Sequence, residues 1–167
     1  PATLRIFEAD GTHRDRLYWA PQNVRRAEDA RLSAADWRDQ VLDALRIAVK
    51  RRMVADVPVG VLLSGGVDSS LVVGLLAELG QTGLQTFSVG FEAANQEKGD
   101  EFVYSDLIAK HYGTDHHQIF VPHDRLMQSL PGTIGAMSEP MVSYDNVGFY
   151  LLSQEVAKHI KVVQSGQ

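Results

Sequence analysis

Val57-Pro-Val-Gly-Val-Leu-Leu63 runs directly into Ser64-Gly-Gly-Val-Asp-Ser-Ser70, and this junction decides the fold. The first half is almost entirely apolar, as expected of a strand that is buried on both faces of a parallel sheet. The second half holds the glycine and hydroxyl residues of a tight turn, followed by the start of a helix. In such a unit the N–H groups of the turn and the helix N-terminus point at an anion. We therefore predict that this loop binds the phosphate groups of a nucleotide.

The loop does not match two common phosphate-binding motifs. A P-loop has a lysine directly after its second glycine, whereas here Gly66 stands at that position after Gly60 and Gly65. The dinucleotide-binding pattern G-x-G-x-x-G is also missing. The loop therefore belongs to another class of nucleotide site, in which no lysine of the loop reaches the terminal phosphates.

Asp68 indicates what replaces the lysine. A carboxylate beside phosphate costs Coulomb energy unless a cation lies between the two. Mg²⁺ meets this requirement, because it binds carboxylate and phosphate oxygens together. The hydroxyl groups of Ser64, Ser69 and Ser70 add hydrogen-bond donors for the same phosphates. An alternative role for Asp68 or Ser69 is to cap the helix that follows, with the glycines serving only the turn.

Several segments of the chain resemble one family. Ser64 to Ser70 resembles the pyrophosphate-binding loop of the N-type ATP pyrophosphatases, which use ATP to adenylylate a substrate and release pyrophosphate. Together with the residues from Asp56 onward, it resembles the synthetase domain of the glutamine-hydrolysing asparagine synthetase family. Further segments that resemble this family follow in the expected order: Thr86 to Phe91, Gly113 to His117, Glu139-Pro140 and Val162 to Gln167.

The resemblance implies a fold and an activity. The fold would be α/β, a doubly wound parallel sheet of the adenine nucleotide alpha hydrolase-like, Rossmann-like type, and the βαβα alternation favours the same class. The activity would be that of an ATP-dependent carbon–nitrogen ligase using ATP and Mg²⁺. It would activate a small-molecule carboxylate, aspartate or a related amino acid or peptide, for amide formation with glutamine-derived ammonia. Alternatives that keep the loop are a GMP or NAD synthetase-like enzyme and a nucleotide-binding module without catalysis.

The resemblance also divides the chain. Residues 1–20, two strand-like runs around Asp10-Gly11, would be the last hairpin of a glutaminase domain that precedes them. Residues 21–32 are polar and are interpreted as a linker. Residues 33–167 would be the N-terminal portion of the synthetase domain, truncated before its end. Such a fragment is not expected to be active alone, and a homodimer is left open.

Candidate nucleotide-binding residues follow from position and from the resemblance. Ligands of open parallel sheets bind beyond the carboxyl ends of the strands. The resemblance places Leu63 and Val89 against the adenosine part of ATP and Asp68 against the Mg²⁺–pyrophosphate, although Leu63 and Val89 also suit a core. The full set is Leu63, Ser64, Gly65, Gly66, Val67, Asp68, Ser69, Ser70, Ser88, Val89, Gly90, Ser165 and Gly166.

The polar loop from Met137 to Asn146 is a candidate site for the substrate carboxylate, because such loops on a rigid scaffold commonly carry function. Its candidate residues are Glu139, Tyr144, Asp145 and Asn146, and the alternative for Asp145 is helix capping.

Gln167 departs from the family pattern. Several asparagine synthetases have a glutamate after this Ser-Gly, and its carboxylate is implicated in the synthetase chemistry. A glutamine cannot exchange a proton at neutral pH but can donate hydrogen bonds to phosphate or acyl oxygens. We count Gln167 with Asp68 among the candidate catalytic residues. The change favours a relative such as the N-acetylglutaminylglutamine amidotransferase-like group.

Hydrophobic spacing predicts the remaining elements. Ser33 and Asp36 predict the start of a helix whose residues Trp37 to Val49 pack on the sheet. In the helix over 68–79, Leu71, Val72, Leu75, Leu76 and Leu79 are expected to form the apolar stripe, with Gly80 ending the helix. The other predicted strands are 84–91, 117–121 and 161–164. The other predicted helices are 102–112, 127–137, interrupted by Pro131, and 146–159.

Composition narrows the possible partners. The 167 residues carry a net charge of −5, so no basic excess is available for nucleic acid. Without cysteine there is no disulfide or thiol nucleophile, and no apolar run approaches the roughly 20 residues of a membrane span. The predicted compartment is the cytoplasm. A metal site at His116 and His117 is disfavoured, because neighbouring residues of a strand point to opposite faces.

Overall fold

The computed structural model describes residues 2–21, 27–91, 102–143 and 145–166. The chain forms two compact units, residues 1–41 and 42–167, and each is described by itself. No helix in the described part of the chain is both long and apolar enough to cross a bilayer.

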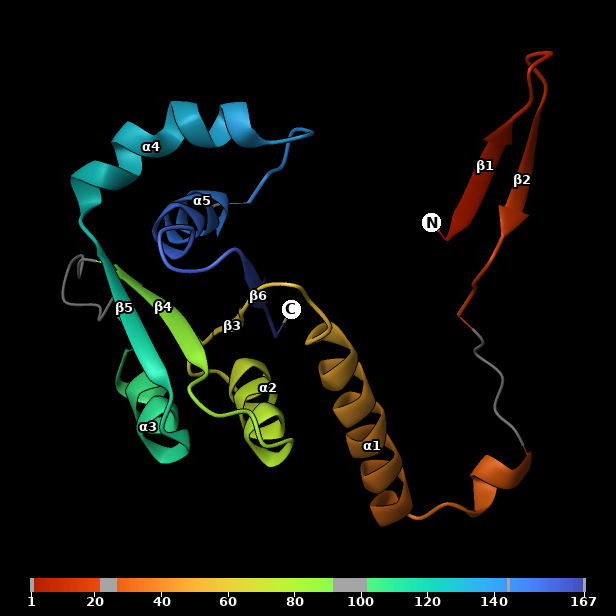
Figure 1. Ribbon diagram of the computed structural model, residues 1–167, viewed down its shortest axis with the longest axis horizontal. Helices are drawn as coiled ribbons and strands as arrows, with labels where there is room; N and C mark the ends of the chain where they lie inside the picture. Colours follow the sequence, from red (N-terminus) through yellow and green to blue (C-terminus); the bar gives the residue numbers. More distant parts are fainter. Residues whose placement is uncertain (1, 22–26, 92–101, 144, 167) are drawn as a thin grey trace. The chain divides into compact units, whose positions relative to one another are not determined.

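A four-stranded sheet forms the centre of the second unit (Figure 1). The strands are β3 (Val59–Leu62), β4 (Gln85–Phe91), β5 (Asp115–Val121) and β6 (Val162–Gln164). Their order is β5-β4-β3-β6, and every neighbouring pair is parallel. From β3 the chain continues through β4 to β5 at one edge of the sheet, and it then crosses back to β6 on the other side of β3. The carboxyl ends of β3 and β6 therefore meet at a topological switch point, where open parallel sheets bind ligands.

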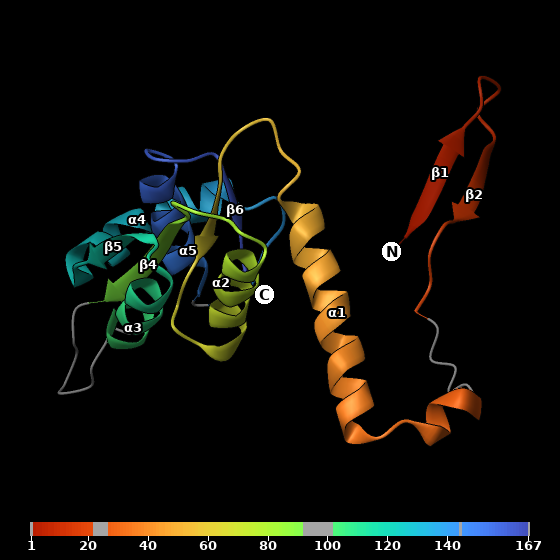
Figure 2. The ribbon, with the colours of Figure 1, turned by 60° about the horizontal axis from the view of Figure 1, so that its bottom comes forward.

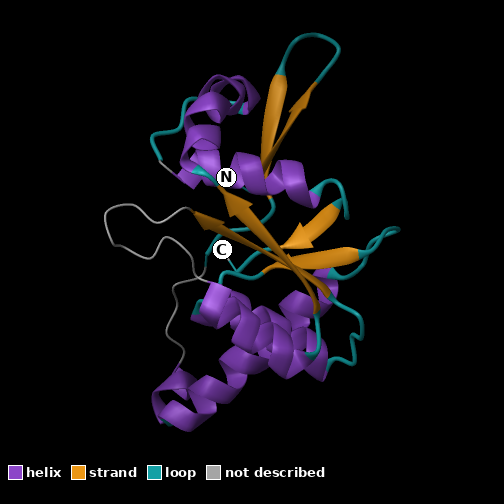
Figure 3. Cartoon of the chain, turned by 90° about the vertical axis from the view of Figure 1, so that its left-hand side faces the viewer, coloured by secondary structure: helices purple, strands orange, loops and turns teal. Residues whose placement is uncertain are grey.

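Helices cover both faces of this sheet (Figure 3). They are α2 (Val67–Glu78), α3 (Phe102–Tyr112), α4 (His123–Ala136) and α5 (Asp145–Val156), joined by the end of α1 (Ala34–Arg52). One core joins β3 to α1, α2 and α3, and its buried residues are Val49, Val61, Leu63, Val73, Leu75, Leu76, Leu84 and Ala109. The other core joins β4 to α5, with Phe87, Leu152, Val156 and Ile160 buried. The prediction of a doubly wound α/β sheet is confirmed.

The apolar face of α2 differs from the predicted stripe. Leu75 and Leu76 are buried as expected, but Leu71 and Leu79 are each 38% exposed and Val73 is completely buried. The stripe prediction assumed one buried face. This helix contacts β3 and also α3, so its buried residues spread over two sides.

Two glycines of this region have defined roles. Gly80 (φ +81°) ends α2 as predicted: its N–H bonds the Ala77 carbonyl, and the next N–H bonds the Leu76 carbonyl. A Cβ on Gly74 would lie 2.8 Å from the Tyr112 hydroxyl oxygen, so this glycine permits a close approach to α3, which lies beside α2 (Figure 2).

Two other elements begin earlier than predicted. The fifth strand starts at Asp115, because its ladder with β4 extends back to Gln85. Helix α4 begins at His123 and continues through Pro131, which was expected to interrupt it. The Thr133 hydroxyl bonds the Ser129 carbonyl, four residues back, at 2.9 Å in this part of the helix.

The first unit holds a hairpin and the start of α1. Strands β1 (Thr3–Phe7) and β2 (His13–Leu17) pair antiparallel, as predicted. A 3-10 helix at Ala27–Arg31 lies within the segment interpreted as a linker.

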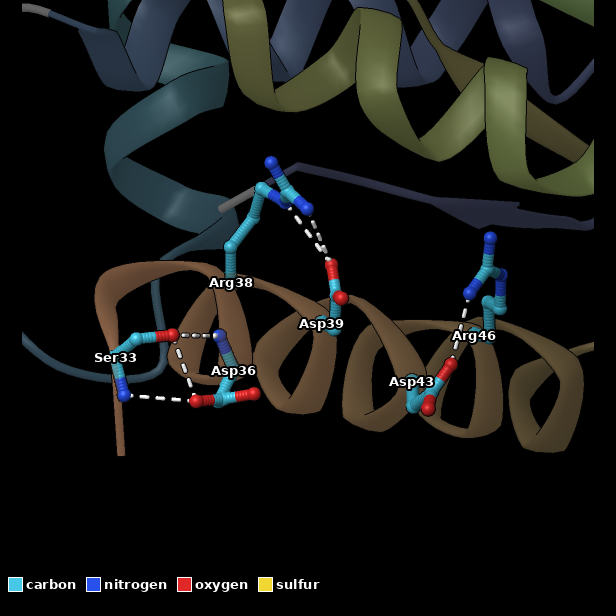
Figure 4. A network of polar contacts seen from close by, with 6 residues as sticks. All are labelled: Ser33, Asp36, Arg38, Asp39, Asp43 and Arg46. Atoms are coloured by element: carbon cyan, nitrogen blue, oxygen red, sulfur yellow. Dashed lines mark hydrogen bonds and ion pairs between the residues drawn. The ribbon is translucent and has the colours of Figure 1, made fainter. Parts of the chain in front are cut away.

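The predicted capping box of α1 is confirmed (Figure 4). The Ser33 N–H donates to the Asp36 carboxylate at 2.8 Å, and the Asp36 N–H donates to the Ser33 hydroxyl at 3.2 Å. In the part of α1 that belongs to the second unit, Val49 is buried as predicted and Leu42 packs against the same core.

Candidate functional site

The loop between β3 and α2 is shaped by its own hydroxyl groups. The hydroxyl oxygens of Ser64 and Ser69 lie 3.1 Å apart, and the Ser64 hydroxyl also accepts from the Gly66 N–H. The Ser69 hydroxyl lies 3.3 Å from the Gly66 carbonyl, which accepts from the Ser70 N–H. These contacts fold Ser64 back over the first turn of α2. Two of the predicted phosphate donors, the hydroxyls of Ser64 and Ser69, are thus held in place by contact with each other.

Helix α2 begins without a side-chain cap. Gly66 is the N-cap residue, with extended backbone (φ −69°, ψ 166°), and within the described residues no side-chain cap bonds the N–H groups of the first turn. The alternative in which Asp68 or Ser69 caps this helix is therefore wrong. A helix start whose N–H groups lack a side-chain partner is suited to an anion.

Gly65 is the residue that the loop geometry demands. Its φ of +83° is strained for any other residue. A Cβ at this position would lie 2.5 Å from the Tyr104 Cβ and 2.7 Å from the Ser105 nitrogen. The loop is therefore pressed directly against the first turns of α3.

Gly166 brings the end of β6 to the same place. A Cβ on Gly166 would lie 2.7 Å from the Ser69 nitrogen and 3.1 Å from the Asp68 Cβ. Ser165, the residue before it, is exposed. The structure thus joins the segments predicted from β3 and β6 at the N-terminus of α2.

Asp68 is exposed in the first turn of α2. Within the described residues, its carboxylate makes no hydrogen bond or ion pair with another side chain. The neighbouring Ser70 hydroxyl is buried and likewise has no hydrogen-bond partner in the structure. Val67 is 83% exposed and contributes its backbone at the helix start rather than packing.

Leu63 and Val89 lie on opposite faces of the sheet. Leu63 is completely buried in the core with α2, whereas Val89 packs against the core with α5. The ladder between β3 and β4 ends where the Leu63 N–H bonds the Phe87 carbonyl at 2.7 Å. Val89, two residues further along β4, points its backbone groups to the same side. A nucleotide beyond β3 would therefore meet backbone at both residues, while the Leu63 side chain remains in the core.

Ser88 and Gly90, the other candidates on β4, are both buried. Ser88 belongs to a polar group beneath the loop that sequence reasoning missed. Its hydroxyl oxygen lies 3.2 Å from the His116 Nε2, and the Thr86 hydroxyl lies 2.8 Å from the His116 Nδ1. The available signal was the alternation of Thr86 and Ser88 in an otherwise apolar strand. The register of β4 with β5, which brings His116 beside Thr86, could not be read from the sequence.

Burial lowers the pKa of His116 below its ordinary value of 6.5, although the Asp106 carboxylate acts in the opposite direction. The folded protein therefore keeps this imidazole neutral where the unfolded chain takes up a proton. It follows that His116 makes folding less favourable as the pH falls below 6.5. We expect the free energy of unfolding to decline more steeply between about pH 7 and about pH 5.5 in the wild type than in His116→Gln. Denaturant unfolding at several pH values checks this, and equal slopes would contradict it.

Glu139 and Asn146, two of the substrate candidates, line one pocket of about 630 Å³. The pocket lies between α4, the segment after it and the start of α5. Its other lining residues include the apolar Leu130, Ile134 and Met137. The Asn146 Nδ2 is buried and has no hydrogen-bond partner among the described residues, so it retains a donor there.

The other two substrate candidates are placed differently. Asp145 is the exposed first residue of α5, and its carboxylate accepts from the Ser143 hydroxyl at 3.2 Å. The Asp145 N–H donates to the same hydroxyl at 3.3 Å. The side chain that bonds the start of α5 is therefore that of Ser143, whereas the alternative role for Asp145 was to cap this helix. Tyr144 and the catalytic candidate Gln167 lie outside the described residues.

Comparisons with known proteins give one consistent family. The asparagine synthase family model matches residues 40–167. A putative asparagine synthetase of Methanocaldococcus jannaschii is 32% identical over 163 residues, which cover 96% of this chain and 30% of that protein. Asparagine synthetase 1 of Bacillus subtilis is 33% identical over 128 residues, covering 77% of this chain and 20% of that protein. The human asparagine synthetase is 33% identical over 133 residues, with 72% and 22% coverage.

A structural comparison matches the ammonia-dependent NAD synthetase of Campylobacter jejuni with a TM-score of 0.48 and 14% identity. That match covers 75% of this chain and 54% of the other. The chain spans less than a third of the length of the curated relatives just named. Their names support the family but not the N-acetylglutaminylglutamine-like group suggested by Gln167. With a family model matched over most of its length, the chain belongs to the asparagine synthase family.

Proposed function

We propose that this chain forms part of an ATP-dependent carbon–nitrogen ligase that activates a carboxylate by adenylylation. The observation that carries the proposal is the loop at Gly65, held between the start of α3 and the Gly166 segment of β6 at the switch point of the sheet. The names of the relatives support the same activity, since they are glutamine-hydrolysing asparagine synthetases. The acceptor would be aspartate or a related amino acid or peptide, and the ammonia would come from glutamine.

The residues of the loop fit a pyrophosphate with its metal. Free N–H groups at the start of α2 and the unpartnered Ser70 hydroxyl are donors for phosphate oxygens. The exposed Asp68 carboxylate is a hard oxygen ligand, of the kind that Mg²⁺ prefers. When bound, the metal would offset the charge of the phosphates. The other candidates from Leu63 to Gly66 and from Ser88 to Gly90 would position the nucleotide at the sheet edge.

The chemistry proposed for the substrate is a transfer in two steps. The carboxylate oxygen attacks the α-phosphorus of ATP, a new O–P bond forms, and pyrophosphate leaves from the loop. Ammonia then attacks the acyl carbon and forms a C–N bond, the C–O bond to AMP breaks, AMP departs with the bonding electrons, and the nitrogen loses one proton to solvent. The chain would contribute mainly positioning and stabilisation of the leaving group. The pocket at Glu139 and Asn146 is the proposed site for the acceptor, and Gln167 would donate hydrogen bonds near the reacting groups.

The domain division belongs to the same proposal. The hairpin of residues 1–20 would close a glutaminase domain, residues 21–32 would connect it, and residues 33–167 would begin the synthetase domain. The antiparallel pairing of β1 with β2 supports the hairpin, whereas the two compact units divide at residues 41 and 42, inside α1.

Product analysis of the full-length protein tests the function. The protein is incubated with ATP, Mg²⁺, glutamine and candidate acids, and the nucleotide product is identified. AMP with pyrophosphate is the expected result. ADP with phosphate would overturn the proposal, and retained ATP binding without turnover would favour a nucleotide-binding module.

Gly166→Ala is expected to weaken binding of MgATP by roughly ten- to a hundredfold, because displaced donors lose their alignment with the phosphates. The added methyl would meet the backbone at Asp68 and Ser69, which can move only with the start of α2. Gly135→Ala is the matched control, since a Cβ there has no neighbour within 4 Å. Calorimetric titration of both variants measures the difference. Wild-type affinity in Gly166→Ala would show that β6 does not shape the site.

A further inference from the structure

A chain of polar side chains runs through the sheet beneath the phosphate loop. The Thr114 and Thr86 hydroxyl oxygens lie 2.8 Å apart, and Thr86 contacts the His116 Nδ1 at 2.8 Å. The His116 Nε2 lies 3.2 Å from the Ser88 oxygen, which lies 3.4 Å from that of Ser105. Thr86 and Ser105 are completely buried, and Ser88 is 4% exposed. Three elements, β4, β5 and α3, are thus connected by side chains alone.

One end of this polar chain reaches the nucleotide loop. Ser105 is the residue whose backbone nitrogen would meet a Cβ on Gly65 at 2.7 Å. Its hydroxyl also bonds the Phe102 carbonyl at 3.1 Å, which fixes the first turn of α3. Ser88 directly precedes Val89, whose backbone faces past the end of β3. His116 lies on β5 and contacts Ser88 of the neighbouring strand. Ser88 in turn contacts Ser105, which lies against Gly65, and directly precedes Val89.

Buried hydroxyl and imidazole groups are a costly way to fill a core. Each must find a partner, and leaving one unsatisfied costs more than an apolar residue of similar size. Either tautomer of the neutral imidazole satisfies both ring nitrogens, because the Thr86 and Ser88 hydroxyls can each donate or accept. Only the neutral form can accept at one of these nitrogens. The lowered pKa of His116 agrees with this arrangement.

We propose that His116 is a positioning residue for the nucleotide loop: through Ser88 and Ser105 it holds the start of α3 against Gly65. The inference rests on the proposed function, because it assigns His116 to the nucleotide site. The contact with the His116 Nε2 holds the Ser88 side chain in place, and Ser88 in turn contacts the Ser105 hydroxyl. The charged or titratable groups that face the imidazole are Asp106, with Oδ1 at 3.7 Å from Nε2, and the neighbouring His117.

Two substitutions of His116 separate positioning from core filling. The amide of Gln reaches the place of Nε2 and can keep the contact with Ser88. The shorter Asn reaches the place of Nδ1 and can keep only the contact with Thr86. We expect His116→Asn to weaken MgATP binding roughly tenfold and His116→Gln to stay within about twofold of wild type, since one hydrogen bond is lost or kept. Isothermal titration of the full-length protein with MgATP gives both affinities.

His117 provides the matched control on the same strand. Its ring stacks on Phe87, with 4.9 Å between ring centroids, and contacts His159 on the other face of the sheet. His117→Gln should alter thermal stability while leaving the affinity for MgATP unchanged. Nitrogen-15 shifts of the His116 ring should show a neutral ring, with a proton on one nitrogen alone, at neutral pH, independently of any activity.

Three outcomes would overturn the inference. Equal affinities in His116→Asn and His116→Gln would show that His116 only fills the core. Protons on both ring nitrogens at neutral pH would contradict the neutral state assigned to His116. If the wild-type protein bound no MgATP, the proposed function itself would fail, and this role of His116 with it. The wild-type titration therefore distinguishes the failure of the function from the failure of the inference.

Discussion

Replacement of Gly65 by alanine should lower the free energy of unfolding by about 3 to 5 kcal/mol, combining left-handed backbone strain with overpacking. The strain arises because φ at Gly65 is +83°. The overpacking arises because the new methyl would lie 2.5 Å from the Tyr104 Cβ and 2.8 Å from the Tyr104 carbonyl carbon. These atoms belong to a helix and cannot rotate away, so the loop or α3 must move.

The adjacent glycine gives a matched control for this change. Gly66 has φ −69°, which any residue adopts, and a Cβ there would meet only the Ser64 hydroxyl at 3.3 Å. Gly66→Ala should therefore cost less than about 1 kcal/mol. Denaturant unfolding followed by circular dichroism, on the full-length variants, measures the two differences side by side. Equal effects would show that the contact between the loop and α3 is not rigid.

The β3–α2 junction was predictable because its signals are local. A continuous apolar run specifies a doubly buried strand, and the residues that follow specify a tight turn. Neither inference needs knowledge of the partner strands. The same holds for the box at Ser33 and Asp36, where both partners lie within one helical turn. Local patterns therefore predicted the parts of the site that belong to one segment.

Contacts between segments were not predictable in the same way. The sequence does not show that the Tyr112 hydroxyl of α3 lies beside Gly74. The burial of Val73 depends on α3 as well. The sequence argued against a metal site at His116 but did not reveal its partners Thr86 and Ser88, because these are set by the register of two strands. Some of the contacts that support the site therefore depend on which strands pair and in which register.

The position of Leu63 shows that strand pairing also decides which atoms of a predicted site residue can contact a ligand. Its side chain is fully buried among α1 and α2, so a nucleotide contact there must use the backbone. Asp68 differs, because its side chain is exposed and free of protein partners within the described residues. Of the predicted loop residues, Asp68 therefore offers the clearest test of side-chain chemistry.

Asp68→Asn should reduce Mg²⁺-dependent release of pyrophosphate by roughly a hundred- to a thousandfold, the scale of losing a charged stabilising group at a reacting phosphate. The substitution keeps the size of the side chain and removes its charge. Because Asp68 neither caps α2 nor pairs with a cation in the described residues, little of the loss should come from unfolding. Pyrophosphate release by the full-length protein is measured over a series of Mg²⁺ concentrations.

Asp124 is the matched control, because it occupies the second position of α4 as Asp68 does in α2. Both are exposed acids in a first helical turn, so each substitution removes a similar interaction with the helix dipole, about 0.3 to 1 kcal/mol. Asp124→Asn should leave pyrophosphate release within about twofold of wild type, since that helix end holds no predicted phosphate loop. If Asp68→Asn retained full activity, the carboxylate would not be a metal ligand. If both variants lost activity equally, the helix dipole rather than the metal would explain the role of Asp68.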